Sequence, residues 1–376
     1  MSEAAQAAAP DSMLQRLKGR FARNERNIAV AFFIGGFLFD IVTVGRVDAW
    51  FTIAQQAAYL LAIGAVLVHM LLEQGAPATD PASRSRVKRW YYEYRSAAIH
   101  FALGALLNLY AIFFFKSSSL LVSFGFLAFL VLLLFANESR RFKSLGLHVK
   151  FALLGLCSLS FAAIVVPIAV GSIGTVVFVA SMAVGVLPAG ALAWWVRRRR
   201  PAHFPALRRQ MVLPLGGVLL AFLVAYLLRV IPPAPLSIPF IGVYHHVERT
   251  SAGYVLQHER EWWRFWHHGD QYFRAQPGDR VFVFFRVFSP ARFADRVQMR
   301  WYWEPGGRGW LLQDTIPIDI VGGREEGFRG YGFKSNYQPG RWKVQVETTD
   351  SREIGRVYFT VESVAEGTRA MTVELE

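Results

Sequence analysis

Five of the nine histidines lie between residues 245 and 268, a density at which a metal site can form. If the chain turns back as a hairpin about Thr250–Gly253, His245 faces His258 across the strands, close enough to share a metal ion. A third ligand would come from one of three residues: Glu259, His267 or His268. The spacing matches no established zinc pattern, and metal-free surface histidines are the simpler explanation. We therefore predict no metal and no cofactor, with His245 and His258 as weak metal candidates.

The sequence contains none of the usual catalytic motifs. It has no Gly-x-Ser-x-Gly elbow, no glycine-rich phosphate loop and no His-Glu-x-x-His helix. The single cysteine, Cys157, lies inside an apolar run and cannot form an intrachain disulfide. The sequence gives no catalytic residue and favours a protein that is not an enzyme.

The segment Glu261–Phe273 combines aromatic residues with basic neighbours, foremost Trp262 and Trp266 beside Arg264. Such a set suits an aromatic belt on the outer leaflet, a stacking platform for a sugar or peptide, or a helix that caps the core of the domain. All three interpretations stay open.

Four cations of the C-terminal third could line one face of a β-sandwich and receive an anionic ligand or partner. Strand alternation places one of them, Arg300, on the polar face of its strand. A solvated face explains the same residues. With the two tryptophans, the predicted ligand-binding set is Trp262, Trp266, Arg300, Arg329, Lys334 and Arg341.

The elements that must position these residues are of two kinds, and the first is a membrane-spanning bundle. Of the 376 residues, 53% are hydrophobic and only 18% charged, which is too apolar for soluble domains alone. A helix needs about 20 apolar residues to cross the hydrocarbon layer. We predict seven spans within residues 27–231: Asn27–Val44, Phe51–Leu72, Ala97–Phe115, Leu120–Ala136, Phe151–Val170, Thr175–Val196 and Met211–Ile231.

The distribution of charge predicts the orientation of this bundle. Residues 235–376 hold 18 basic and 18 acidic residues, so the rest of the chain carries the whole net charge of +14. The excess lies in the N-terminal arm, residues 1–26, and in every second joint between spans. Short basic segments stay in the cytoplasm, so the C-terminal part is predicted to be periplasmic. The run Arg197–Arg200 is explained by a stop-transfer anchor, with an anionic-lipid patch as the alternative, and no nucleic-acid partner is expected.

Polar residues inside the spans are costly and draw attention to the outer leaflet. Because odd spans run outward and even spans inward, five of these residues are expected near the outer face. They either form a functional cluster below the periplasmic domain, or Asp40 pairs with Arg46 or Lys116 and the amides hold helices together. The predicted cluster consists of Asp40, Gln55, Gln56, Asn108 and Arg229.

The second kind of element is the β-strand. Residue types repeat with period two over four stretches, as in half-buried antiparallel strands: 280–288, 297–303, 342–347 and 357–361. Glycine- and proline-rich turn signals lie between them: Pro305–Gly307, Gly322–Gly323 and Gln338–Gly340. We predict six to eight strands in an all-β sandwich-like domain at 241–364, after a proline-rich linker at 232–240 and before a frayed tail at 365–376.

One part of this β-region is similar to a known family. The chain from about Arg300 to Glu362 resembles a bacterial domain of unknown function that usually follows membrane segments. The likeness is carried by four short runs: Arg300–Trp301, Phe328–Ser335, Gly340–Val346 and Arg356–Val361. The resemblance implies a bacterial inner-membrane protein with a C-terminal periplasmic domain, and it implies no catalytic residue.

Two classes of function fit these features. The first is a multi-pass inner-membrane protein, with a cytoplasmic N-terminus, whose periplasmic sandwich binds a partner protein, peptide, glycan or lipid headgroup. The alternative is a transporter or membrane transferase component that uses the outer-leaflet polar cluster and is gated by the sandwich. A signal receptor is a third possibility, which would need a separate cytoplasmic partner because the inner loops are short.

Overall fold

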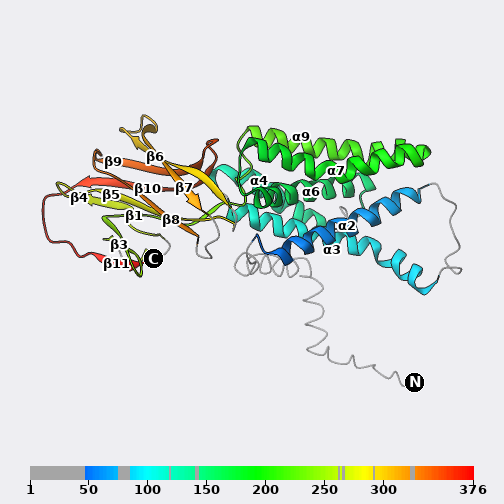
Figure 1. Ribbon diagram of the computed structural model, residues 1–376, viewed down its shortest axis with the longest axis horizontal. Coiled ribbons are helices and arrows are strands. Elements are labelled where there is room, and N and C mark those ends of the chain that lie inside the picture. The colour runs from blue at the N-terminus through cyan, green and yellow to red at the C-terminus, as the bar shows by residue number, and fades with distance from the viewer. Residues whose placement is uncertain are drawn as a thin grey trace, which may run out of the picture. The chain divides into compact units, whose positions relative to one another are not determined.

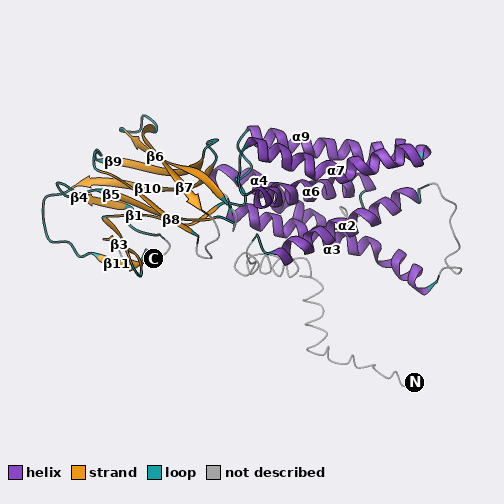
Figure 2. Ribbon diagram, in the orientation of Figure 1, coloured by secondary structure: helices purple, strands orange, loops and turns teal. Residues whose placement is uncertain are grey.

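The computed structural model of the chain describes residues 47–74, 85–117, 120–139, 144–260, 263–264, 267–290, 293–321 and 327–376. A helical N-terminal region is followed by a β-rich C-terminal domain, as predicted (Figures 1 and 2).

The main helices are α2 (Trp50–Leu72), α3 (Arg86–Lys116), α4 (Leu120–Glu138), α6 (Leu147–Val170), α7 (Thr175–Arg199) and α9 (Leu213–Leu227). Shorter turns join α7 to α9: η2 (Pro201–His203), α8 (Phe204–Leu207) and the π-helix η3 (Arg208–Val212).

Fewer candidate membrane spans are found among the described residues than the seven predicted. Within the described residues, five helical stretches are long and apolar enough to cross a membrane: Trp50–Leu72, Arg86–Lys116, Leu147–Val170, Thr175–Arg199 and Pro201–Leu227. The expected fourth span, Leu120–Ala136, forms α4, whose apolar stretch among the residues with described side chains is Phe124–Asn137. The expected first span, Asn27–Val44, lies outside the described residues. The structure therefore gives five candidate spans rather than seven.

The β-rich domain contains three sheets among the described residues. The first has the order β1-β5-β8, with β1 at Ser237–Tyr244, β5 at Val281–Phe288 and β8 at Phe328–Lys334. The second has the order β4-β10-β9-β6-β7: β4 Tyr272–Ala275, β10 Glu353–Ser363, β9 Gly340–Thr348, β6 Ala294–Glu304 and β7 Leu311–Val321. The third has the order β11-β3-β2: β11 Thr372–Leu375, β3 Gly253–His258 and β2 His246–Thr250.

Four features of the domain differ from the sequence-based expectation. Eleven strands form among the described residues, instead of six to eight. Strand β1 begins at Ser237, inside the predicted linker, and the chain before it is buried from Ile231 to Leu236. Strand β4 pairs with β10 in the parallel direction. Strand β11 pairs with β3, so the predicted tail is an ordered part of the domain. These four features depend on pairing between segments that are distant in the sequence. The local alternation of residue types does not reveal that pairing.

The first two sheets pack face to face around one hydrophobic core. Alternate residues of β5, β6 and β9 point inward, among them Phe285, Trp301 and Trp342, which are almost fully buried. Gly332 of β8 permits a close approach of the layers, because a Cβ atom there would lie 2.9 Å from the Met299 Sδ of β6. The third sheet covers the outer face of β1 and β5 through a smaller core that includes Tyr244, Leu256 and Phe284.

Two sets of contacts join the helices to the β-rich domain. The guanidinium of Arg352 lies 3.4 Å from the centroid of the Tyr226 ring at the end of α9, and its Nη2 donates to the Tyr226 carbonyl oxygen at 3.0 Å. At the turn between α6 and α7, the Ala294 N–H donates to the Gly171 carbonyl, and the Ile173 N–H donates to Asp295 Oδ2 at 3.0 Å. Strands β6 and β10 therefore start at the helical region and run away from it.

Candidate ligand-binding cleft

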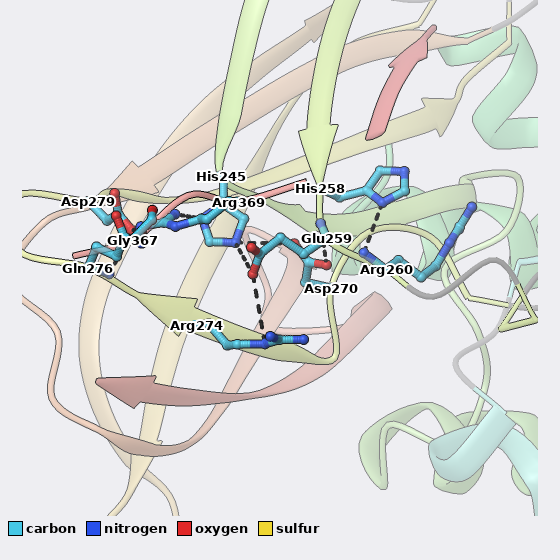
Figure 3. A network of polar contacts seen from close by, with 10 residues as sticks. All are labelled: His245, His258, Glu259, Arg260, Asp270, Arg274, Gln276, Asp279, Gly367 and Arg369. Atoms are coloured by element: carbon cyan, nitrogen blue, oxygen red, sulfur yellow. Dashed lines mark hydrogen bonds and ion pairs between the residues drawn. The ribbon is translucent and has the colours of Figure 1, made fainter. Parts of the chain in front are cut away.

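A cluster of titratable side chains lies where β1, β3 and β4 meet (Figure 3). Strand β10 leaves the helical junction at Arg352, and only its last residues, Thr360–Ser363, pair with β4. At about 3.3 Å per residue, this places β4 roughly 25–30 Å from the junction. The cluster thus lies at the end of the domain remote from the helices.

His245 is the centre of this cluster. Its Nδ1 lies 3.0 Å from Arg369 Nη1, and because arginine can only donate, Nδ1 is the accepting nitrogen and the ring proton is on Nε2. Burial, and then the charge of Arg369, lower the pKa of His245 to about 4, so the imidazole is neutral near pH 7. Its Nε2 lies 3.6 Å from both Glu259 Oε2 and Asp270 Oδ2. These two contacts are longer than hydrogen bonds and, with a neutral ring, are not ion pairs.

Asp270 is the most perturbed acid of the cluster. Its side chain is 2% exposed, and its Oδ1 accepts a hydrogen bond from the Glu259 N–H at 2.9 Å. Burial raises the pKa of Asp270 to about 7, against the effect of this hydrogen bond and with added repulsion from the Glu259 carboxylate. Asp270 Oδ2, Glu259 Oε2 and His245 Nε2 are all buried and have no hydrogen-bond partner among the described residues.

His258 lies nearby but makes separate contacts. Its Nδ1 accepts from the Arg260 N–H at 3.2 Å, and its Nε2 lies 3.8 Å from Glu374 Oε2 of β11. Burial and the Arg260 charge lower the pKa of His258 to about 4. The hairpin of β2 and β3 forms as predicted, but the two imidazoles turn toward different carboxylates. Over the described part of the chain, no group of three or more His, Cys, Asp or Glu side chains is arranged to hold a metal ion.

A cleft of about 240 Å³ opens beside this cluster. Its floor includes Glu259 and Asp270, and three arginines contribute to its wall: Arg260, Arg264 and Arg274. The Arg274 side chain is 58% exposed, and its Nε lies 3.9 Å from Glu259 Oε2. The Arg264 guanidinium lies 5.3 Å from the centroid of the Tyr272 ring. The cleft therefore offers cationic donors at its wall and buried carboxylate acceptors at its floor.

The C-terminal segment holds the back of the cluster in place. Arg369 Nη2 pairs with Asp279 Oδ2 at 2.6 Å, and Gln276 Nε2 donates to the Gly367 carbonyl at 2.9 Å. Because Arg369 fixes the tautomer of His245, residues predicted to be a frayed tail set the chemistry of the cluster.

The predicted cationic set does not share one face. Arg300 and Arg341 lie on the outer face of the five-stranded sheet, where Arg300 pairs with Glu347 at 3.3 Å and Arg341 with Glu304 at 2.7 Å. Arg329 and Lys334 belong to β8 of the other sheet. Lys334 is buried and pairs with Asp314. The expectation of a single face is wrong because β8 crosses to the opposite sheet.

The remaining predicted residues do not form one cluster, and some of them lie outside the described residues. Gln55 is exposed and its amide lies 3.4 Å from the Tyr59 hydroxyl, whereas Gln56 is buried and donates to the Thr52 carbonyl. Asn108 is half-buried in α3, and Arg229 is exposed after α9. Asp40, Trp262 and Trp266 lie outside the described residues.

Sequence reasoning missed Asp270, Arg274 and Arg369. A usable signal was the Gly269-Asp270 pair. Gly269 has φ +62°, and a Cβ atom there would lie 2.1 Å from the Val243 carbonyl oxygen, so only glycine allows the close approach that buries Asp270.

One family model matches the chain, over a segment that includes most of the second sheet. Residues 294–361, from β6 into β10, match a family described as Protein of unknown function (DUF2914). This agrees with the expected domain of unknown function, and every residue of the cleft named above lies outside the match. No curated protein matches the chain.

Several solved structures are weakly similar. An immunoglobulin-like protein from Pseudomonas aeruginosa is 13% identical, with 34% of this chain and 98% of that chain covered and a TM-score of 0.22. A beta-glucosidase from Listeria innocua is 10% identical over 24% of this chain and 14% of that chain, with a TM-score of 0.19. An alkylpurine DNA glycosylase from Pseudomonas fluorescens is 13% identical over 84% of this chain and 99% of that chain, with a TM-score of 0.21. TM-scores this low carry no argument about function.

Proposed function

We propose that the protein is a multi-pass membrane protein that binds a polar ligand in the cleft of its β-rich domain. One observation carries the proposal: three buried polar atoms, on His245, Glu259 and Asp270, converge without hydrogen-bond partners among the described residues, beside a wall of arginines. An unsatisfied buried polar group costs about 1–3 kcal/mol. Buried polar groups that stay unsatisfied despite this cost are typical of functional sites, where a protein loses folding stability in order to bind a ligand.

The chemistry of the cleft favours a ligand with both donor and anionic groups. Glu259 and Asp270 accept hydrogen bonds, and Arg260 and Arg274 provide cationic donors that suit a carboxylate or phosphate. A volume of about 240 Å³ is below the roughly 300–1,000 Å³ of sites for drug-sized molecules. It suits one terminal group of a larger chain. A peptide end or an acidic glycan fits this description better than a flat protein surface.

Other binding modes have weaker support. The cations on the outer face of the five-stranded sheet are already paired with carboxylates, as Arg300 is with Glu347. Strand β7 is an edge strand, but it carries Pro317, and proline at a sheet edge blocks the addition of another strand. A headgroup of the protein's own bilayer would lie roughly 25–30 Å from the cleft, if the helices cross that bilayer.

The membrane orientation is part of the proposal. The alternation of basic and charge-poor joints supports a cytoplasmic N-terminus and a periplasmic β-rich domain in a bacterial inner membrane. The five candidate spans support insertion in a bilayer. A reporter fused after Glu376 that is active only in the cytosol would contradict this orientation.

One observation favours the alternative of a transporter or transferase component. The Gln56 side chain is buried in α2, and its Oε1 has no hydrogen-bond partner within the described ranges. Under that alternative Asp40→Asn abolishes function, whereas under the binding proposal it leaves ligand capture unchanged.

Photo-cross-linking in cells tests the binding proposal. A photoreactive amino acid in place of Tyr272, which lines the cleft, is expected to give an adduct with a peptide or glycan, identified by mass spectrometry. Adding Arg274→Gln is expected to remove most of that adduct, because the arginine holds the anionic group.

The matched control carries the same photoreactive residue in place of Tyr302, on the outer face of the five-stranded sheet. It is expected to give no specific adduct. Equal adducts at both positions, or an adduct at Tyr272 that survives Arg274→Gln, would contradict the proposal.

A further inference from the structure

A second cavity lies within the helical region, between α2, α6, α7 and the start of α9. Its volume is about 420 Å³, and Ser158 is the single polar side chain among the described residues that line it. The Ser158 Oγ donates to the Gly185 carbonyl at 2.8 Å, so even this group is satisfied. The cavity is therefore an apolar groove.

Small residues create the groove. Gly64 of α2 lines it, and a Cβ atom there would meet nothing closer than a Leu154 Cδ2 at 3.8 Å. Ala189 and Pro188 of α7 line the opposite wall. Gly185 also lines the groove, but there the helices pack tightly, since a Cβ atom on Gly185 would lie 2.9 Å from a Leu159 methyl carbon.

Cations lie at one end of this groove on three of its helices. Lys150 directly precedes the lining residue Phe151 of α6, and Arg209 precedes Met211 by two residues. Arg197 follows Leu192 of α7 by five residues. At 1.5 Å per residue, these positions lie about 1.5 to 8 Å along the helix axes from the apolar lining. In the proposed orientation this is the cytoplasmic end.

The arginines beside the groove sit in an unusual backbone segment. Arg208 and Arg209 are exposed on the π-helix η3, whose Met211 lines the groove. Gln210 of the same segment exchanges two hydrogen bonds with Gln74 after α2, at 2.8 and 3.2 Å. Isolated π-helical turns occur frequently at functional sites.

We propose that this groove holds an acyl chain of an anionic phospholipid whose phosphate binds Arg208 and Arg209. A groove with an apolar lining and cations at one end suits an acyl chain beneath a charged headgroup. Charge decides the headgroup, because juxtamembrane arginines attract anionic lipids. The inference rests on the proposed membrane placement and not on the cleft.

Native mass spectrometry of the full-length protein, with phosphatidylglycerol, cardiolipin or phosphatidylethanolamine added, tests this inference. The parent is expected to retain one anionic lipid after delipidation and to release phosphatidylethanolamine. Gly64→Leu, which fills the groove, is expected to lower retention about tenfold. Arg208→Gln with Arg209→Gln is expected to lower it roughly 30-fold, the effect of removing two charges near a lipid headgroup.

Matched controls separate the groove from general effects. Gly190→Leu adds the same side chain at an exposed position of α7 with no atom within 4 Å, and Arg86→Gln with Arg89→Gln removes two exposed charges of α3. Both controls are expected to retain the lipid as the parent does. Should Gly64→Leu fail to fold, Ala189→Leu fills the groove from the other wall. Equal retention by all variants, or a cross-link from position 64 to residues 27–44 in place of lipid, would overturn the proposal.

Discussion

Arginine and carboxylate side chains gather at two places in the β-rich domain, and their surroundings differ. On the outer face of the five-stranded sheet, Glu347 lies 3.3 Å from Arg300 and Glu304 lies 2.7 Å from Arg341. At the cleft, Glu259 Oε2 lies 3.9 Å from Arg274, and Asp270 Oδ2 faces a neutral histidine. The arginines of the sheet face therefore lie closer to their carboxylates than Arg274 of the cleft lies to Glu259.

This difference teaches that abundance of charge does not mark a binding site. A charged side chain that is paired within the fold contributes to stability. A ligand that binds this side chain must first displace the other member of the ion pair. A buried acceptor without a partner destabilises the free protein and gains most from a ligand that satisfies it. The two places should therefore respond in opposite directions to mutation.

The largest expected effect is that of Asp270→Asn. Asp270 has a pKa of about 7 in the folded protein against an ordinary value of 3.8, so between these values the folded state holds a proton that the unfolded state has released. The contribution of Asp270 to stability therefore falls as pH rises from about 4 to 7. Asparagine does not titrate and keeps an acceptor for the Glu259 N–H. The variant is expected to match the parent near pH 4 and to exceed it by on the order of 3–4 kcal/mol at pH 8.

Pulse proteolysis of the full-length protein in urea, repeated across this pH range, measures the difference in free energy of unfolding. The lowered pKa values of His245 and His258 make the parent and the Asp270→Asn variant less stable as pH falls from 6.5 toward 4. This loss cancels when the free energies of unfolding of the two proteins are subtracted. A variant that is less stable than the parent at pH 8 would show that Asp270 is satisfied within the fold.

The second effect has the opposite sign and belongs to the sheet face. Glu347→Ala leaves Arg300 without its carboxylate in a place where the Glu347 side chain is 8% exposed. It is expected to lower the free energy of unfolding by about 2 kcal/mol, because a partly buried charge loses its partner. The same proteolysis assay measures this loss, and the Tyr272 adduct is expected to stay at the parental level. Loss of the adduct without loss of stability would place the ligand on the sheet face.

The smallest effect is expected from Arg341→Gln. This side chain is 65% exposed, and a surface ion pair contributes little. The free energy of unfolding is expected to change by less than about 0.5 kcal/mol, with an unchanged adduct. A clear drop in ligand capture would show that the paired face takes part in binding.

Local patterns predicted much of the fold. The alternation around Trp301 and Trp342 gave β6 and β9, and the apolar runs gave helices α2, α3, α4, α6, α7 and α9. The placement of the cations failed because β8 lies in the other sheet, which no pattern within Phe328–Lys334 encodes. Strand β11 was missed because its order comes from pairing with β3, more than 100 residues earlier in the chain.

The candidate site was predicted only in part for the same reason. His245 and Glu259 attracted attention by their types, and they do lie together at 3.6 Å. Arg369 became visible only in three dimensions, because the tautomer of the His245 imidazole depends on a segment that is distant in the sequence.

A crystal structure of the full-length protein, purified gently from its native cells and resolved well enough to show ordered water, tests the central claim most directly. We predict density larger than a water molecule in the cleft, with one end at Arg274 and donors directed at Glu259 and Asp270. A single water that bonds His245 Nε2, Glu259 and Asp270, with nothing else in the cleft, would contradict the account, since these atoms would then be satisfied as an ordinary buried-water site.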